Sequence, residues 1–369
     1  MLRPYCAKMT FFNDYILCVF VVKNLTVPLN YAEVCIMNSY ERYMAILKGE
    51  KTDILPRLPI LMAFAANYID SYYGAFASDY RVLVDANLKC VEDFDFDQVS
   101  AISDPYRETQ GFGAEIQFPR DGVPRCVVPP LENTKDLSTL KKPDPYSSTR
   151  MLDRIQAIRE FKKSVYGKYS IMGWIEGPVA EAADLRGVTN LLMDLAMDPE
   201  FAVELMDLCV KVEIEFAIAQ IESGADTIGI GDAIASQISP AMYEEFIFPQ
   251  EKKIIDGIHE ADGIVRLHIC GNTTHLLPYM AELGADIIDL DWQVDMKKAR
   301  QILGTKTVLV GNLDPVNAVM KATPEQIINH VRQIYSDVGN PYMVGAGCEI
   351  PPGTPYENLK ALCGLVAYS

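Results

Sequence analysis

Thr227-Ile-Gly-Ile-Gly-Asp232 and Ile264-Val-Arg-Leu-His-Ile269 are short apolar runs separated by a helical pattern over residues 240–260. Short apolar runs that end in Gly, Asp or Pro are typical of buried strands. A strand, a helix and another strand in succession predict a pair of parallel strands with the helix packed across them. This stretch therefore predicts an α/β protein with a parallel sheet.

The same alternation recurs along most of the chain. Further strands are predicted at residues 58–64, 169–175, 287–291, 307–312 and 342–346, and helices at residues 150–166, 187–223, 323–338 and 355–366, with a break near Asp198-Pro199. Repeated units of this kind favour a closed (β/α)8 TIM barrel. The alternative is an open doubly wound sheet, but no Gly-x-Gly-x-x-Gly turn follows an early strand, which weakens it.

One stretch departs from this alternation. Residues 91–142 contain the acidic segment Glu92-Asp-Phe-Asp-Phe-Asp97 and Pro-rich loops such as Val128-Pro-Pro130. We interpret the stretch as an insertion at the mouth of the barrel that forms a lid. No linker separates two independent domains, so residues 37–369 are expected to form a single barrel domain.

Residues 1–36 are interpreted as an N-terminal extension whose place in the native protein stays open. Arg3 and Lys8 precede the apolar run at residues 15–22, as in a signal peptide, but Lys23-Asn-Leu-Thr26 follows where a small-x-small cleavage site is needed. The alternative is that translation begins at Met37, where an amphipathic helix starts with Ser39 as its N-cap.

Composition excludes several classes of function. The 369 residues include 33 lysines and arginines against 50 aspartates and glutamates, a formal net charge of −17. Such a surface repels phosphate backbones and anionic lipids, so we expect no nucleic-acid and no membrane partner. Nine cysteines at irregular spacing do not resemble a secreted disulfide framework and indicate a reducing, cytoplasmic compartment. The sequence contains no apolar run of about 20 residues, the length that a membrane-spanning helix needs.

Histidine and cysteine residues mark a candidate metal site. His268 and Cys270 lie two residues apart on a predicted strand, so both side chains point to the same side. Cys348 follows the last predicted strand, and the strands of a barrel end at one common rim. One imidazole and two thiolates suit Zn²⁺, and three protein ligands leave a fourth position open, as in catalytic zinc sites. From spacing alone, the alternative of buried filler cysteines stays open.

Polar residues also follow other predicted strands. Glu176, Asp232 and Asn312 are candidates for holding or orienting a substrate at the rim. Each of them can equally cap a helix or fix a loop. The aromatic residues that can line a pocket near this rim, or belong to the core, are Trp174, Trp292, Tyr68 and Tyr72.

Four segments resemble the uroporphyrinogen decarboxylase superfamily. They are residues 224–232 with 239–246, Asp291-Trp-Gln-Val-Asp295, Gly311-Asn-Leu-Asp-Pro315 and Gly353-Thr-Pro-Tyr-Glu-Asn358. The likeness covers nearly the whole chain from Met37 and implies a uroporphyrinogen-decarboxylase-like (β/α)8 barrel. Ser103-Asp104 resembles the site of the decarboxylases themselves. However, their arginine-rich loop reads Met62-Ala-Phe-Ala-Ala-Asn-Tyr-Ile-Asp70 here, and their late Gly-His-Gly reads Gly347-Cys-Glu349.

The segments His268-Ile-Cys270-Gly-Asn272, Gly347-Cys348-Glu-Ile-Pro-Pro352 and Ile175-Glu-Gly-Pro-Val179 resemble another branch of the superfamily. This branch comprises the corrinoid-dependent methyltransferases of the methylcobamide:thiol and O-demethylase types. The resemblance implies that His268, Cys270 and Cys348 hold Zn²⁺ and that a methyl group moves between a small-molecule methyl donor or thiol and a corrinoid (cobalamin). No Asp-x-His-x-x-Gly cobalamin-binding pattern occurs, so the corrinoid is expected on a partner protein.

The resemblance does not fix the direction of methyl transfer, although a methyl donor is slightly favoured as the substrate. Two alternatives remain open. One is a metal-free lyase that decarboxylates a tetrapyrrole, and the other is a barrel that only binds a corrinoid or substrate without catalysis.

Overall fold

The computed structural model describes residues 37–368, so the extension predicted at residues 1–36 lies outside the described part of the chain. Its centre is a sheet of seven parallel strands in the order β1-β4-β5-β6-β7-β8-β9. These strands are β1 (Gln98–Ser100), β4 (Ser170–Glu176), β5 (Thr227–Gly231), β6 (Ile264–His268), β7 (Ile287–Asp289), β8 (Val308–Val310) and β9 (Tyr342–Met343).

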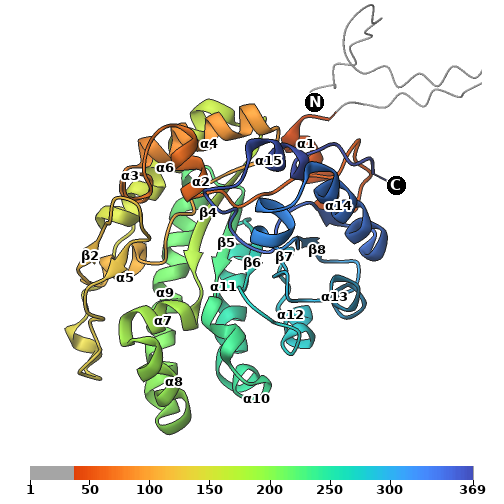
Figure 1. Cartoon of the computed structure of the whole chain (residues 1–369). Helices are drawn as coiled ribbons and strands as arrows, with labels where there is room; N and C mark the ends of the chain where they lie inside the picture. Colours follow the sequence, from red (N-terminus) through yellow and green to blue (C-terminus); the bar gives the residue numbers. More distant parts are fainter. Residues whose placement is uncertain (1–36, 369) are drawn as a thin grey trace, which may run out of the picture.

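Helices surround the sheet in chain order, as the passage from orange through green to blue in Figure 1 shows. The longer ones are α1 (Ser39–Leu47), α4 (Tyr80–Phe94), α6 (Thr149–Val165), α7 (Pro178–Arg186), α8 (Val188–Met197), α9 (Pro199–Ser223), α11 (Phe248–Glu260), α13 (Met296–Leu303) and α14 (Pro324–Val338). The shorter ones are α2 (Ala63–Tyr68), α3 (Tyr73–Ser78), α5 (Arg107–Gly111), α10 (Pro240–Met242), α12 (Leu277–Leu283) and α15 (Tyr356–Leu362). Single 3₁₀ or π turns are η1 (Leu137–Thr139), η2 (Ala233–Gln237), η3 (Tyr243–Ile247) and η4 (Pro315–Met320). No helix within residues 37–368 is long and apolar enough to cross a membrane.

An extended segment closes the sheet into a ring. The Leu58 amide donates to the carbonyl of Val344, next to β9, at 2.7 Å, and the Val344 amide donates to Pro56 at 2.7 Å. On the other side, the Asp97 amide next to β1 donates to the carbonyl of Arg57 at 2.9 Å. Residues 56–58 thus bridge the two edge strands, and the predicted (β/α)8 barrel is confirmed.

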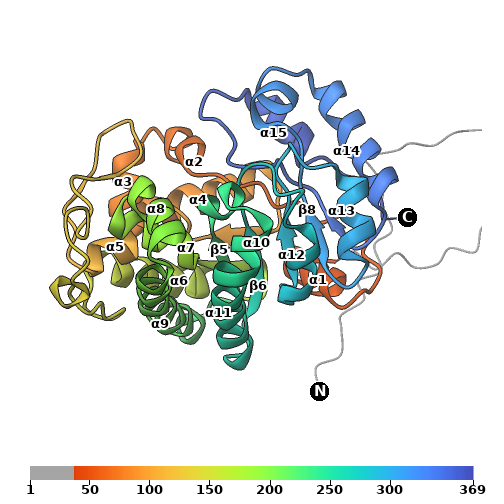
Figure 2. The same cartoon turned by 90° about the horizontal axis from the view of Figure 1, so that it is seen from below.

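The inside of the barrel is layered. On β4, Met172, Trp174 and Glu176 point inward, because alternate residues of a strand share a face. The opposite face of β4 packs against the surrounding helices. At the N-terminal end of the strands, α1 covers the barrel, and the Tyr43 hydroxyl lies 2.7 Å from Oγ1 of Thr227 at the start of β5. Figure 2 views the same barrel from below.

The strands predicted at residues 169–175, 227–232, 264–269, 287–291, 307–312 and 342–346 are confirmed, with ends that differ by at most three residues. The helices predicted at residues 150–166, 187–223 and 323–338 are also confirmed, including the break at Asp198-Pro199. The strand predicted at residues 58–64 is wrong, because this segment has only an isolated bridge at Arg57 and hydrogen bonds of an extended chain, and residues 63–68 form α2. Ala63-Phe-Ala-Ala66 has the alanine content that favours a helix. The predicted cap is also shifted by one residue, since Asn38 caps α1.

The start of the predicted insertion is wrong. Residues 98–100 form the barrel strand β1, which pairs with β4 and belongs to the central sheet. The inserted part comes later and contains the small hairpin β2 (Ile116–Gln117) and β3 (Arg125–Cys126) with η1. Val123, in the turn between these two strands, lines the cavity at the mouth of the barrel. The lid is therefore present, but it does not include β1.

Candidate metal centre and active-site cavity

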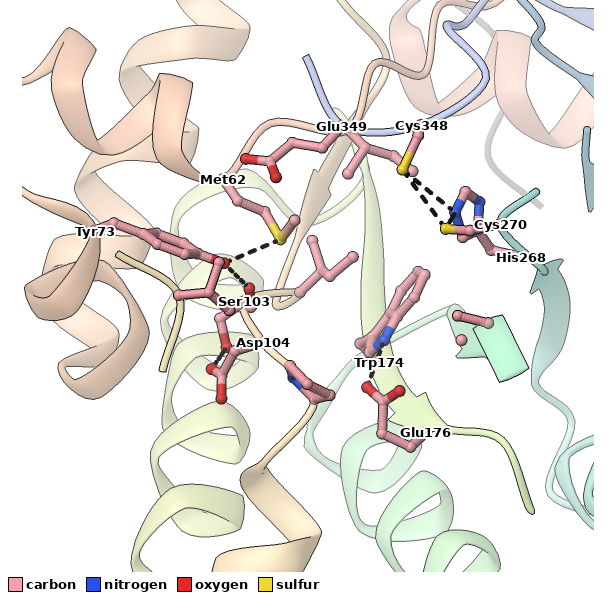
Figure 3. Close-up of a pocket in the computed structure, with 16 residues that line it drawn as sticks. Met62, Tyr73, Ser103, Asp104, Trp174, Glu176, His268, Cys270, Cys348 and Glu349 are labelled. Atoms are coloured by element: carbon pink, nitrogen blue, oxygen red, sulfur yellow. Dashed lines mark hydrogen bonds between the residues drawn. The ribbon is translucent and has the colours of Figure 1, made fainter. Parts of the chain in front are cut away.

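The His268 imidazole and two cysteine sulfurs meet at the C-terminal end of the barrel strands. His268 is the last residue of β6, Cys270 follows it, and Cys348 lies beyond β9. The distance from Nε2 of His268 to Sγ of Cys270 is 3.0 Å, and Sγ of Cys348 is 3.6 Å from Sγ of Cys270 and 3.9 Å from the same Nε2. The structure therefore brings together the three predicted ligands (Figure 3).

Two of the three distances are close to those of a tetrahedral metal site, whereas the distance of 3.0 Å between His268 and Cys270 is shorter. Zn–S and Zn–N bonds of about 2.3 and 2.0–2.1 Å at tetrahedral angles separate two sulfurs by about 3.8 Å, and a sulfur from a nitrogen by about 3.6 Å. The ligand atoms of His268, Cys270 and Cys348 all lie within 4.8 Å of one another. Three protein donors would leave a fourth position of a bound ion for a substrate, and all three residues line the cavity.

A buried carboxylate holds the imidazole in place. Nδ1 of His268 lies 3.1 Å from Oδ2 of Asp289, and Nε of Arg266 donates to both oxygens of Asp289 at 2.9 and 3.0 Å. The pairing of β6 with β7 sets His268 directly beside Asp289. Of the two neutral tautomers, a carboxylate on Nδ1 favours the one that carries the proton there, and its free Nε2 is the form that binds a metal.

The groups of the cluster shift one another's pKa values. The contact with Cys270 and the neighbouring imidazole outweigh burial and lower the pKa of Cys348 to about 4. The contact with Cys348 raises the pKa of Cys270. Of the two thiol protons, one is therefore lost readily and the other is retained. Burial opposes a charged His268, but Cys270 and Asp289 overcome it and raise the pKa of the imidazole. A thiolate is therefore present at neutral pH beside a buried histidine.

A cavity of about 220 Å³ opens over this cluster (Figure 3). Trp174 forms one wall, with its ring centroid 6.2 Å from that of His268. Glycines on β5 make room for the indole, because a Cβ at Gly229 would lie 2.2 Å from the Trp174 ring and one at Gly231 would lie 2.9 Å from it. Val123 of the lid, Met62 and Tyr73 complete much of the remaining wall.

Three carboxyl groups line the cavity in different environments. Oε1 of Glu176 accepts hydrogen bonds from Arg107 at 2.6 Å and from Trp174 at 3.3 Å, and burial outweighs Arg107 and raises its pKa to about 7. Burial also raises the pKa of Glu349 to about 7, although Glu349 accepts a hydrogen bond from a backbone amide. For Asp104, burial is outweighed by the paired Arg150, which lowers the pKa to about 2.

The structure places Asp232 and Asn312 outside the cavity lining. The Asp232 carboxylate accepts a hydrogen bond from the Ala180 amide at 2.7 Å and lies beside Glu251, behind the barrel wall. Nδ2 of Asn312 donates to the carbonyls of Asp291 and Val294 at 2.9 and 2.7 Å, which fixes the loop after β7. These contacts correspond to the capping and loop-fixing alternatives, and of the three residues Glu176 alone lines the cavity.

The predicted aromatic pocket is present only in part. Trp174 lines the cavity, whereas Trp292 is half exposed and Tyr68 packs against Phe64, Phe94 and Tyr356. Sequence reasoning missed Tyr73 and did not assign a role to Asp289. The signal for Asp289 was available, because strand ends that are neighbours in a parallel barrel place their side chains together.

The chain matches the profile of the uroporphyrinogen decarboxylase (URO-D) family over residues 38–368. It is 32% identical over 274 residues to the methylcobamide:CoM methyltransferase MtbA of Methanosarcina acetivorans, which covers 72% of this chain and 78% of that protein. It is 25% identical over 347 residues to the uroporphyrinogen decarboxylase of Trichlorobacter lovleyi, covering 88% and 97%. A solved methyltransferase from Methanosarcina mazei shares the fold, with a TM-score of 0.81, 24% identity and coverage of 88% and 97%.

These matches confirm the resemblance drawn from the sequence, including that to the corrinoid-dependent methyltransferase branch. The family profile spans almost every residue that the structure describes. The chain therefore belongs to the uroporphyrinogen decarboxylase (URO-D) family.

Proposed function

We propose that the protein is a zinc-dependent methyltransferase that moves a methyl group between a small thiol or methyl donor and the corrinoid of a partner protein. The observation that carries this proposal is the cluster of His268, Cys270 and Cys348 at the mouth of the barrel. The names of relatives at 32% and 29% identity, both methylcobamide:CoM methyltransferases, support a thiol and a corrinoid as reaction partners.

The residues of the chain have distinct tasks in this proposal. When bound by His268, Cys270 and Cys348, a zinc ion supplies Lewis acidity, which lowers the pKa of a thiol or of a leaving oxygen. Asp289 keeps the proton of His268 on Nδ1 and fixes the ring, and Arg266 fixes Asp289. Trp174 and the lid residue Val123 exclude water from the space above the cluster.

The alternative of tetrapyrrole decarboxylation has less support. Relatives at 25–27% identity are uroporphyrinogen decarboxylases. However, pockets for drug-sized ligands have volumes of about 300–1,000 Å³, whereas this cavity measures about 220 Å³. Among the residues that line it, no lysine or arginine is present to pair with the carboxylates of such a substrate.

The decisive experiment measures metal per chain by elemental analysis of protein purified without chelator. We expect about one zinc in the wild type, the stoichiometry of a mononuclear catalytic site. Cys270→Ala and Cys348→Ala should lose it, whereas Cys126→Ala, a half-buried cysteine of the lid, should keep it. The zinc-loaded protein is then tested for methyl transfer from a methylated corrinoid protein to thiols, followed by the corrinoid absorbance. A folded wild type without metal would contradict the proposal.

A further inference from the structure

The cavity over the metal cluster contains more acidic than basic groups. Glu176, Glu349 and Asp104 line it, and no lysine or arginine is found among its sixteen lining residues. Figure 3 shows Glu176 below Trp174, and Glu349 on the same side of the cavity as Cys348. His268 is the only lining residue of basic type, and it belongs to the proposed metal site.

The two nearest arginines do not supply free positive charge to the cavity. Arg150 is buried against Asp104, with contacts of 2.5 and 3.2 Å. Arg107 is fully buried and contacts both Glu176 at 2.6 Å and Glu108 at 3.4 Å. Three more carboxyl groups with raised pKa values lie on α7 and α9: Glu181 and Glu213 are fully buried, and Asp184 is half-buried.

Glu349 has no cationic side chain against it. Its carboxylate accepts a hydrogen bond from the Ala63 amide at 2.8 Å, and no ion pair involving it is found within residues 37–368. The wall between Glu176 and the metal cluster is the Trp174 indole, whose nitrogen donates to Glu176 at 3.3 Å. Carboxylates next to an aromatic ring attract a small organic cation and repel an anion.

We propose, resting on the function proposed above, that the small-molecule substrate carries a positively charged group, such as an ammonium, beside the sulfur or oxygen that is directed to the His268–Cys270–Cys348 cluster. An acidic substrate such as a sulfonate is disfavoured. The cavity of about 220 Å³ admits only a small molecule of this kind. The charged group pairs with Glu349, which has no cationic partner, or with Glu176, which shares Arg107 with Glu108, and the other end reaches the sulfur cluster.

Three thiols of the same backbone test the inference: cysteamine, 2-mercaptoethanol and 2-mercaptoethanesulfonate. They carry an ammonium, a hydroxyl and a sulfonate at the same position. Binding to the zinc-loaded protein is measured by isothermal titration calorimetry, without a corrinoid partner. We expect cysteamine to bind on the order of tenfold or more tightly than 2-mercaptoethanesulfonate, with 2-mercaptoethanol between them.

Because the three thiols differ in their own acidity, the decisive quantity is the change in the affinity ratio between wild type and variant. Glu176→Gln and Glu349→Gln should each reduce the ratio of cysteamine to 2-mercaptoethanesulfonate affinity by about fivefold or more. Glu251→Gln is the matched control, since Glu251 is also buried with a pKa of about 7 but lies outside the cavity lining, beside Tyr243. It should leave the ratio unchanged.

Two results separate failure of this inference from failure of the proposed function. If 2-mercaptoethanesulfonate binds as tightly as cysteamine, or if neither cavity variant changes the ratio, the inference is overturned while the methyltransferase proposal stands. If none of the three thiols binds to the zinc-loaded protein, the inference is overturned, and if the folded wild type holds no zinc, the methyltransferase proposal is overturned with it. Two cavity variants are used because Glu176→Gln also leaves Arg107 without its partner.

Discussion

Replacement of Asp289 by asparagine should weaken zinc binding without removing a metal ligand. Nε of Arg266 is a donor only, so the amide oxygen of the new side chain is expected to face Arg266. The amide NH₂ group then faces Nδ1 of His268, which lies 3.1 Å from Oδ2 of Asp289 in the native protein. Nδ1 must accept this hydrogen bond, so the imidazole proton moves to Nε2, the atom that faces Cys270. The variant therefore favours the tautomer that does not bind zinc.

The expected loss of zinc affinity follows from removal of the carboxylate that holds the His268 imidazole. Loss of such a carboxylate partner weakens metal affinity by about 10- to 100-fold, which is about 1.4–2.7 kcal/mol, and the change of tautomer places Asp289→Asn near the upper end. The metal-free fold should also lose about 1.5–3 kcal/mol, because a charged hydrogen bond to the buried Arg266 is weakened.

The matched control is Asp97→Asn at the opposite end of the barrel. Asp97 is fully buried and pairs with Arg57 at 2.8 Å and with Arg42 at 2.6 Å, so its loss should lower stability by a similar amount. The zinc Kd is measured by competition with a chromophoric chelator, and stability by urea unfolding with chelator present. The reasoning is refuted if Asp289→Asn keeps the wild-type zinc Kd, or if Asp97→Asn weakens zinc binding equally.

Three further predictions concern the cavity wall and the base of the barrel. Gly229→Ala places a Cβ 2.2 Å from the Trp174 ring, so it should cost about 1–3 kcal/mol and shift tryptophan fluorescence; an unshifted spectrum would contradict the packing argument. Burial raises the pKa of Glu176 to about 7, so its protonated form favours folding. The stability of wild type relative to Glu176→Gln should therefore fall as the pH rises from about 5 to about 8, as urea unfolding at both pH values tests. Tyr43→Phe removes the hydrogen bond to Thr227 and should cost about 0.5–1.5 kcal/mol at unchanged zinc content, which thermal melts with metal analysis can check.

The sequence predicted those parts of the fold that depend on local pattern. Strands with apolar residues on both faces, such as β4 and β8, were found because both faces are buried. Strand β1 was missed because its inward residue Gln98 is polar: it accepts a hydrogen bond from Arg266 inside the barrel at 2.7 Å. A polar residue that faces a buried arginine looks like a loop residue until its partner, 168 positions away, is known.

The cluster of His268, Cys270 and Cys348 was predictable because two of its members lie two residues apart at the end of one strand, whereas the substrate candidates needed the direction of each side chain. Gly229 and Gly231 of β5 face the cavity side, so Ile228, Ile230 and then Asp232 point to the outer side. The alternation that identified the strand therefore also excludes Asp232 from the cavity. Glu176 lies on the same face of β4 as Met172 and Trp174, and it reaches the cavity.

Strand β6 shows how the fold and the site depend on each other. Its inward residues are Ile264, Arg266 and His268, and they lie in three successive layers of the barrel. Ile264 packs on the apolar layer under the sheet, Arg266 holds Asp289, and His268 faces the cavity. A buried ion pair seldom stabilises a protein more than apolar residues of the same size. The Arg266–Asp289 pair is therefore better explained by the orientation of His268 than by the stability of the barrel, because apolar replacements would fill the same space and leave the imidazole without its partner.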